Sequence, residues 1–437
     1  MVKTIADRLV NISRLNFVRN FATLSGGQAI ATLIPILTAP ILGRLYLPAD
    51  YGVLGTYMAF GAVLATIGNL QYFKGVIVDK QEHDAIATLA LAMRITLGMS
   101  VLALAVVALV RLLEPASWSN SELWPWFWLL PLTILMASQT AALQAFANRQ
   151  NRYGFMSRLQ IVSVVVTTGL SIGLGLLKWG AAGLMTAYFG GQIIAFFYVI
   201  AGNREAFGLA RRAQWADMRA AAVRHRDFAQ WTTPTAVVEQ VAMAFPIYVL
   251  GLRGGMLDVV GHFNRARSLL ALPVQMFATA IGQVFFRRGA EEIARLDSAT
   301  HLFYRLAIGL TAIAVPMFGI LYLIAPTLFV FVLGPNWHET GEVARILAPV
   351  IGLQFVVQPL TKILWLHGYQ RLDFIMSVSF AAFTIGAVLL ATQIISSPMN
   401  VIVAYAMAQG VMYVAFLAVA FWIAHRHRHL RAEPAAL

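Results

Sequence analysis

Apolar stretches of about 20 residues recur along almost the whole chain, and this repetition constrains the fold more than any other feature. A helix needs about this length to cross roughly 30 Å of hydrocarbon. Hydrophobic residues make up 59% of the 437 and charged residues only 12%, so a soluble domain would lack the polar surface to cover itself. The sequence therefore predicts an all-α integral membrane protein.

The apolar stretches correspond to about twelve membrane-spanning helices. We predict spans at residues 21–43, 51–73, 87–110, 123–147, 159–177, 180–201, 231–251, 258–286, 303–325, 343–366, 372–395 and 399–424. The longest polar stretch separates the first six from the last six. The predicted organisation is a six-helix bundle over 1–202, a basic cytoplasmic linker over 203–230, a second six-helix bundle over 231–425 and a cytoplasmic tail over 426–437.

The distribution of Lys and Arg predicts the orientation of the helices, because cytoplasmic loops keep positive charge and translocated loops are depleted of it. Of the 32 Lys and Arg residues, 23 fall on the side of the amino terminus, 5 on the opposite side and 4 within spans. We therefore expect a multi-pass membrane protein with both termini in the cytoplasm.

The linker is rich in arginine, and two interpretations of it stay open. It is a solvated connection, or it forms a surface helix whose arginines meet anionic lipid headgroups. The net charge of +13 does not indicate nucleic-acid binding, because the basic residues lie in short loops and no base-reading motif is present.

The two halves show a faint internal similarity that is typical of transporters built from a duplicated unit. Gln28 precedes Pro35 by seven residues in the first span, and Glu239 precedes Pro246 by seven in the seventh. Proline interrupts the hydrogen bonds of a helix and favours a kink. Bendable first and seventh helices suit pseudo-symmetric bundles that rock against one another.

Polar side chains fall on one face of several apolar spans. At 100° per residue, the eighth span aligns Asn264, Arg265, Gln275 and Gln283. The tenth aligns Gln354, Gln358 and Lys362, and the first contributes Gln28. We interpret these faces as the polar lining of a cavity, although hydrogen bonds between helices use the same residue types.

Ionisable residues within spans are the strongest candidates for a site, because a charge in hydrocarbon costs several kcal/mol unless it meets a cavity or a partner. Arg265 and Lys362 are expected to line a cationic cavity, and such a cavity selects anionic cargo. Arg94 is a weaker candidate, since a residue near a span end also snorkels to the headgroups. Glu239 is a candidate for H⁺ or Na⁺ coupling, or else a structural partner of a buried cation.

Several function classes find no support in the sequence. Zero cysteines exclude thiolate metal sites and a cysteine nucleophile. We expect no bound metal, no cofactor beyond a coupling ion and no nucleic-acid partner. The predicted external loops are short, which disfavours a membrane glycan polymerase or ligase, and we expect no enzymatic activity.

Four segments resemble motifs of the Wzx-like O-antigen flippases, the polysaccharide transport branch of the multidrug, oligosaccharidyl-lipid and polysaccharide exporter superfamily. They are the turn Gly43 to Gly52, the stretch from Arg226 through Thr233 and Pro234 to Phe245 and Pro246, the span Gly261 to Phe286, and the run Leu333-Gly334-Pro335-Asn336-Trp337. They occur in matching order over most of the chain.

The resemblance implies a V-shaped, alternating-access transporter that flips an undecaprenyl-diphosphate-linked oligosaccharide for O-antigen, capsule or exopolysaccharide synthesis. It also implies contact with membrane lipids and a polysaccharide polymerase or export complex. The family's cationic cavity lining maps onto Arg265, Arg267 and Lys362, with the choice between the two arginines open. A multidrug exporter and a flippase of the peptidoglycan-precursor lipid are the alternatives within the superfamily.

Overall fold

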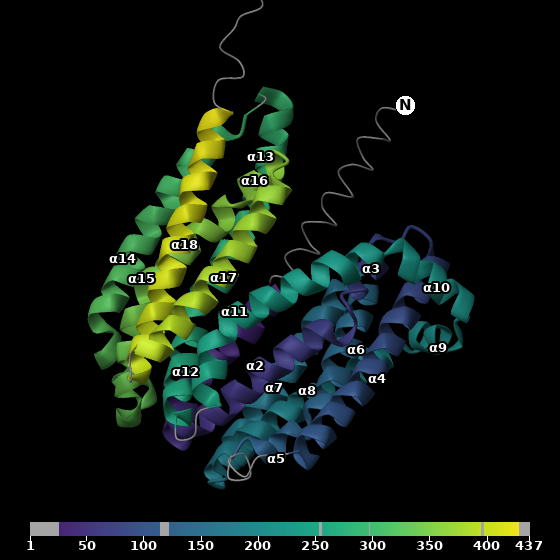
Figure 1. The fold of residues 1–437 in the computed structure, drawn as a ribbon, viewed down its shortest axis with the longest axis horizontal. Helices are drawn as coiled ribbons and strands as arrows, with labels where there is room; N and C mark the ends of the chain where they lie inside the picture. The colour runs from purple at the N-terminus through teal and green to yellow at the C-terminus, as the bar shows by residue number, and fades with distance from the viewer. Residues whose placement is uncertain (1–25, 114–121, 253–255, 297, 395–396, 428–437) are drawn as a thin grey trace, which may run out of the picture. The chain divides into compact units, whose positions relative to one another are not determined.

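The computed structural model describes residues 26–113, 122–252, 256–296, 298–394 and 397–427, and in these ranges the chain is helical with short connections (Figure 1). Contacts divide it into two compact units. Unit 1 contains residues up to Tyr46 and Thr56–Val237, and unit 2 contains Leu47–Gly55 and Val238 onward. Both α2 and α11 therefore contribute residues to the two units.

The first part of the chain forms a helix Gly26–Leu45 and the helices α2 to α10. Their bounds are α2 Pro48–Gly68, α3 Phe73–Val78, α4 Glu82–Leu112, α5 Trp124–Phe127, α6 Leu130–Arg149, α7 Tyr153–Leu176, α8 Gly180–Gly202, α9 Arg204–Arg212 and α10 Trp215–Arg224. A buried core of small and aliphatic side chains from α3, α4 and α6 also includes residues of α9 and α10. The short helices are thus packed parts of unit 1.

The second part of the chain begins with a π-helical turn, η1, before Pro234. The elements are η1 Phe228–Thr232, α11 Thr233–Gly251, α12 Leu257–Pro273, η2 Val274–Ala278, α13 Thr279–Leu296, α14 Thr300–Leu333, η3 Pro335–Trp337, α15 His338–Leu360, α16 Lys362–Leu366, α17 Gln370–Ile394 and α18 Pro398–Arg426. A second π-helical turn, η2, follows Pro273, whose missing N–H disturbs the regular ladder.

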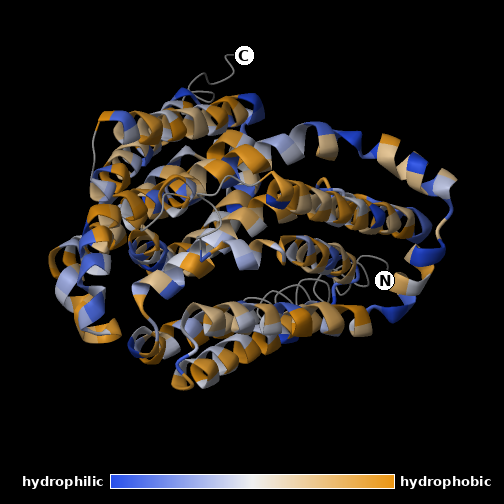
Figure 2. Cartoon of the chain, turned by 60° about the horizontal axis from the view of Figure 1, so that its bottom comes forward, coloured by the Kyte–Doolittle hydropathy of each residue, from blue (hydrophilic) through white to orange (hydrophobic). Residues whose placement is uncertain are grey.

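Eleven helices in the described part of the chain are long and apolar enough to cross a membrane. The predicted eighth span, 258–286, falls on α12, η2 and α13, which follow one another without a break. This segment is not among the eleven. Polar and charged residues occur along it, and a π-helical turn lies within it. The expected all-α, multi-pass membrane protein is confirmed, and the hydropathy colouring of Figure 2 shows apolar residues along its helices.

Two glycines let the first turns of α2 and α12 meet backbone to backbone within unit 2. A Cβ on Gly52 would stand 1.7 Å from the carbonyl oxygen of Leu257, and one on Gly261 would stand 1.8 Å from that of Pro48. Neither position has room for a side chain without moving the backbone. This reciprocal approach accounts for glycine in two of the segments that the sequence singled out.

The predicted linker is not an extended connection. It folds into α9 and α10, and the side chains of Ala206, Ala210, Met218 and Ala221 are buried in the core of unit 1. Tyr72, which precedes α3, donates a hydrogen bond of 3.3 Å to the carbonyl oxygen of Ala222. The segment is therefore helical, and this alone does not decide between a solvated connection and a helix on anionic lipid.

Candidate functional site

Arg265 is a cation in unit 2 whose hydrogen-bonding capacity is not used. It lies on α12, and its guanidinium carbon stands 4.8 Å from the centroid of the Tyr51 ring. Its Nε and Nη2 atoms are buried and find no hydrogen-bond partner among the described residues. Asn264, beside it, lies against Gly55, where a Cβ would come within 2.6 Å of its amide nitrogen. Three N–H bonds of Arg265, one on Nε and two on Nη2, are therefore left for an acceptor that the described residues do not supply.

Arg267 lies two residues farther along α12 and has a different environment. Its Nη1 atom donates a 2.7 Å hydrogen bond to the carbonyl oxygen of Met243 on α11. The hydroxyl of Tyr405 on α18 donates to the same oxygen over 3.1 Å. Arg267 thus joins α11 and α12, and the structure separates two arginines that the sequence left equivalent.

Lys362 is the first residue of α16, just after α15 ends. Its ammonium lies 4.0 Å from the centroid of the Trp365 ring. Its methylene stem lies beside Gly282 of α13, where a Cβ would come within 4.0 Å of Cγ. Gly282 is seventeen residues beyond Arg265 along the helical path through η2, which corresponds to about 25 Å. Arg265 and Lys362 therefore belong to well-separated levels of unit 2.

The residues predicted to form the polar lining of the cavity differ in how exposed they are. Asn264 and Gln354 are half-buried in unit 2, whereas Gln275 and Gln358 are exposed there. Gln28 is exposed on the helix Gly26–Leu45 of unit 1. Gln283 lies on α13, and its side chain is outside the described part. Glu239 is exposed on α11.

Arg94 lies in unit 1 and contacts the short helices. Its Nη2 atom is 3.2 Å from the carbonyl oxygens of Arg211 and Ala213, at the carboxyl end of α9. Its Nη1 atom is 2.9 Å from the sulfur of Met218 on α10. A cation at this helix end satisfies free carbonyl groups and opposes the negative end of the helix dipole. Arg94 therefore ties α4 to α9 and α10.

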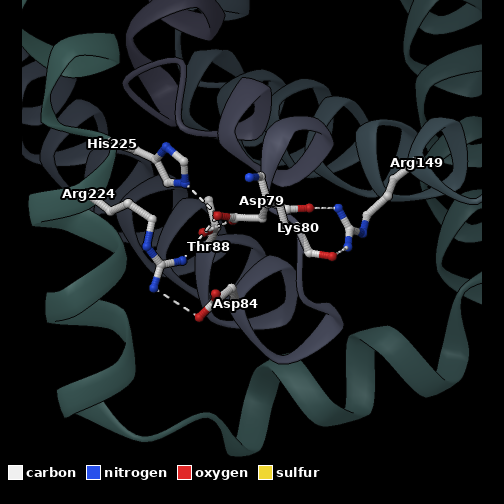
Figure 3. Close-up of polar contacts among 7 residues, drawn as sticks. All are labelled: Asp79, Lys80, Asp84, Thr88, Arg149, Arg224 and His225. Carbon is white, nitrogen blue, oxygen red and sulfur yellow. Dashed lines mark hydrogen bonds and ion pairs between the residues drawn. The ribbon is translucent and has the colours of Figure 1, made fainter.

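A charged cluster that sequence reasoning did not anticipate surrounds Asp79, between α3 and α4 (Figure 3). The Asp79 side chain is 2% exposed, and Thr88 Oγ1 donates to it over 2.6 Å. His225 Nε2 stands 2.8 Å and Arg224 Nη1 3.0 Å from its Oδ1 atom. Arg224 also reaches Asp84 over 2.9 Å. The cluster joins α10 to the start of α4.

Arg149, the last residue of α6, completes the cluster from the other side. It donates hydrogen bonds to the carbonyl oxygens of Asp79 and Lys80, the second over 3.0 Å. Burial alone raises the pKa of the Asp79 carboxyl, but the hydrogen bonds from Thr88, His225 and Arg224 outweigh it and hold the pKa below its usual value. Asp79 thus keeps its negative charge to a lower pH than a free carboxyl, within a network that is internally satisfied.

Metal binding finds no geometric support in the described residues, where no group of three or more His, Asp or Glu side chains is arranged to hold an ion. The cationic residues of unit 2 instead provide N–H donors and positive charge. These groups bind anions, above all phosphate oxygens, through charge-assisted hydrogen bonds.

A family model described as "Polysaccharide biosynthesis protein" matches residues 41–342, which is more than half of the chain. None of the curated proteins compared with the chain matches it.

Solved transporter structures share the fold at low sequence identity. The lipid II flippase MurJ, in an inward closed conformation, matches with a TM-score of 0.70 and 13% identity over 92% of this chain and 90% of that one. An inward-facing multidrug resistance MATE family transporter of the MOP superfamily matches with a TM-score of 0.62 and 14% identity over 92% and 96%. A MOP superfamily transporter from Pyrococcus furiosus, described as having a binding pocket of reverse polarity, matches with a TM-score of 0.59 and 14% identity over 94% and 95%.

Proposed function

Because this chain belongs to the polysaccharide biosynthesis protein family, we propose that it is a flippase for a polyprenyl-diphosphate-linked oligosaccharide. The direction of movement is from the cytoplasmic to the periplasmic leaflet of the bacterial inner membrane, for O-antigen, capsule or exopolysaccharide synthesis. The observation that carries the proposal is the guanidinium of Arg265, whose buried Nε and Nη2 atoms have no acceptor among the described residues. A diphosphate supplies acceptor oxygens and the opposite charge.

The separation of Arg265 and Lys362 suggests how a diphosphate passes through. One diphosphate is only a few ångströms long, so it does not reach two cations about 25 Å apart along the helix path at the same time. Lys362 belongs to the last turn of a span and Arg265 to the first half of α12. With the predicted orientation, Lys362 meets the diphosphate near the cytoplasmic side and Arg265 near the periplasmic side.

Energy for the movement has to come from a gradient or from consumption of the product. Glu239 on α11 is the proposed coupling carboxylate for H⁺ or Na⁺. Replacing it with Gln keeps the shape and removes the charge. Transport by Glu239→Gln that still depends on an imposed gradient, to the same extent as in wild type, would remove Glu239 from this role.

The test uses a deletion strain complemented with single variants. We expect the strain to accumulate an unflipped polyprenyl-diphosphate-linked glycan, which the wild-type gene clears. Arg265→Gln and Lys362→Gln should each slow clearance by about 10- to 100-fold, since hydrogen bonds to charged groups contribute about 1.5–3 kcal/mol. Arg305→Gln, which changes an exposed arginine at the start of α14, is the matched control and should behave as wild type.

The same strain distinguishes the other cargo classes of the superfamily. Accumulation of a peptidoglycan-precursor lipid in place of a glycan carrier would assign the chain to that cargo. Increased drug sensitivity without any accumulated lipid-linked glycan would make it a drug exporter, and the proposal would be wrong.

A further inference from the structure

The short helices α9 and α10 connect two candidate membrane spans, Gly180–Gly202 and Phe228–Gly251. A chain that leaves one span and enters the next through about 25 residues starts and ends at a bilayer surface. Figure 1 shows α9 and α10 beside α3 and one end of α4. The segment is therefore close to lipid headgroups, and its outward side chains decide what it does there.

The outward face of α9 is cationic. Its buried residues Ala206 and Ala210 lie on one side of the helix, and Arg204, Arg211 and Arg212 lie on the other, within a sector of about 100°. All three arginines are exposed. In the described part of the chain none of their side chains has an ion-pair or hydrogen-bond partner. Three positive charges thus lie on this face without a pairing partner in the described part of the chain.

The outward face of α10 is largely apolar. Trp215 is 71% exposed and Val223 63%, and exposed Ala216 and Ala220 lie between them on the same side of the helix. Arg219 adds an exposed positive charge to this face. Tryptophan with neighbouring arginines is typical of helices that lie in a membrane interface, with the indole among the upper acyl chains and the guanidinium groups among phosphates.

This face is held in place from behind. Arg94 contacts the carboxyl end of α9, and Arg224 and His225 hold the end of α10 through Asp79. A Cβ on Gly75 would stand 2.9 Å from the His225 ring, so a small residue is needed for this close packing. The arginines of α9 and α10 therefore divide into one that is paired inward, Arg224, and four that face outward.

We propose that the outward faces of α9 and α10 form a binding surface for anionic phospholipid, with Arg204, Arg211, Arg212 and Arg219 on the phosphates and Trp215 in the interface. The surface is separate from the cations assigned to the cargo. Charge complementarity favours anionic phospholipid as the ligand, because the cytoplasmic leaflet carries negative charge. A bilayer would also cover the apolar face of α10.

The test uses the full chain in nanodiscs of phosphatidylcholine, with or without about one third phosphatidylglycerol. Amide hydrogen exchange over 204–223 should be about tenfold slower in the discs that contain phosphatidylglycerol. Arg211→Gln with Arg212→Gln should remove most of this protection, because each basic residue near an anionic surface strengthens attachment about fivefold. The control pair is Arg305→Gln with Arg371→Gln, which removes the same charge from exposed positions in unit 2 and should keep the protection.

A second measurement places Trp215 itself. Brominated acyl chains should quench the fluorescence of wild type more than that of Trp215→Phe. Equal exchange in both kinds of disc, or equal quenching of the two proteins, would overturn the proposal and leave this face to a protein partner. Equal loss of protection in the two arginine pairs would also overturn it, because the effect would then follow net charge alone.

Discussion

The arginines that bond within unit 1 and Arg265 of unit 2 are used in opposite ways. In unit 1, Arg149 donates to two backbone carbonyls, and Arg152 donates to the Gly202 carbonyl over 2.8 Å and to Asn203 over 3.1 Å. Arg224 is paired with two carboxylates. In unit 2, Arg267 likewise donates to the Met243 carbonyl, whereas Arg265 lies on the Tyr51 ring and its guanidinium keeps buried N–H groups with no acceptor among the described residues.

The difference teaches that the presence of a cation within a membrane helix does not identify a binding residue. Its remaining hydrogen-bonding capacity is the better criterion, because a satisfied arginine gains little from a ligand whereas an unsatisfied one gains a full charge-assisted bond. By this criterion unit 1 uses its arginines to hold helices together. Arg265 is the residue that we propose for contact with the cargo.

The largest effect is expected from the charged cluster of unit 1. Asp79→Asn keeps the shape of the side chain but leaves Arg224 without its most buried partner. We expect a loss of about 3 kcal/mol in the free energy of unfolding, at the low end for breaking a buried pair because Arg224 is partly exposed. Thermal unfolding of the purified protein in detergent measures this loss.

The pH dependence of the same pair gives the control. Since the pKa of Asp79 is lower in the folded protein, its contribution is fully present above the unfolded pKa, near 3.8, and is lost as the pH falls through the folded value. The difference between wild type and Asp79→Asn should therefore persist from about pH 8 to pH 5 and be lost only in stronger acid. A difference that already disappears near pH 6 would contradict this account of Asp79.

A smaller effect on stability is expected from a change at Arg94. This residue sharpens the comparison, because the sequence made it a candidate for lining the cavity. Arg94→Gln should cost about 1 kcal/mol of stability, since its hydrogen bonds to the Arg211 and Ala213 carbonyls are partly exposed. Transport per folded molecule should not change. A tenfold loss of transport at unchanged stability would instead restore Arg94 to the cargo path.

The smallest effect on stability is expected at Arg265. Arg265→Met replaces a cation whose Nε and Nη2 atoms lack acceptors among the described residues by an apolar side chain of similar length, so the free energy of unfolding should stay the same or rise by up to about 1 kcal/mol. The same change should impair cargo clearance. A loss of 2 kcal/mol or more would show that Arg265 is satisfied within the fold, and the contrast between the units would be broken.

The sequence predicted the parts of this molecule that depend on local composition. Hydropathy gave the membrane helices, and the expected resemblance to polysaccharide flippases is confirmed by the family match. The eighth span was harder to predict from hydropathy, because it carries Arg265, Arg267 and a π-helical turn. Its polar stripe indicated cavity residues, a hypothesis that transport measurements have yet to test.

The charged cluster was not predicted because its members are distant in the chain. Asp79 lies 145 residues before Arg224 and 70 before Arg149, and no local pattern reports such contacts. The sequence left the choice between Arg265 and Arg267 open for a related reason. It depends on a carbonyl of α11, at Met243, that a helical projection of α12 does not include.

The paired glycines at the starts of α2 and α12 also bear on synthesis of the protein. Residues Leu47–Gly55 are grouped with unit 2, and Gly52 meets Leu257. At translation rates of 5–20 residues per second, roughly 10–40 s pass between the synthesis of Gly52 and the synthesis of Leu257. During this interval the first turn of α2 lacks its packing partner in the nascent chain. A membrane chaperone that covers this part of α2 would be most useful at this stage.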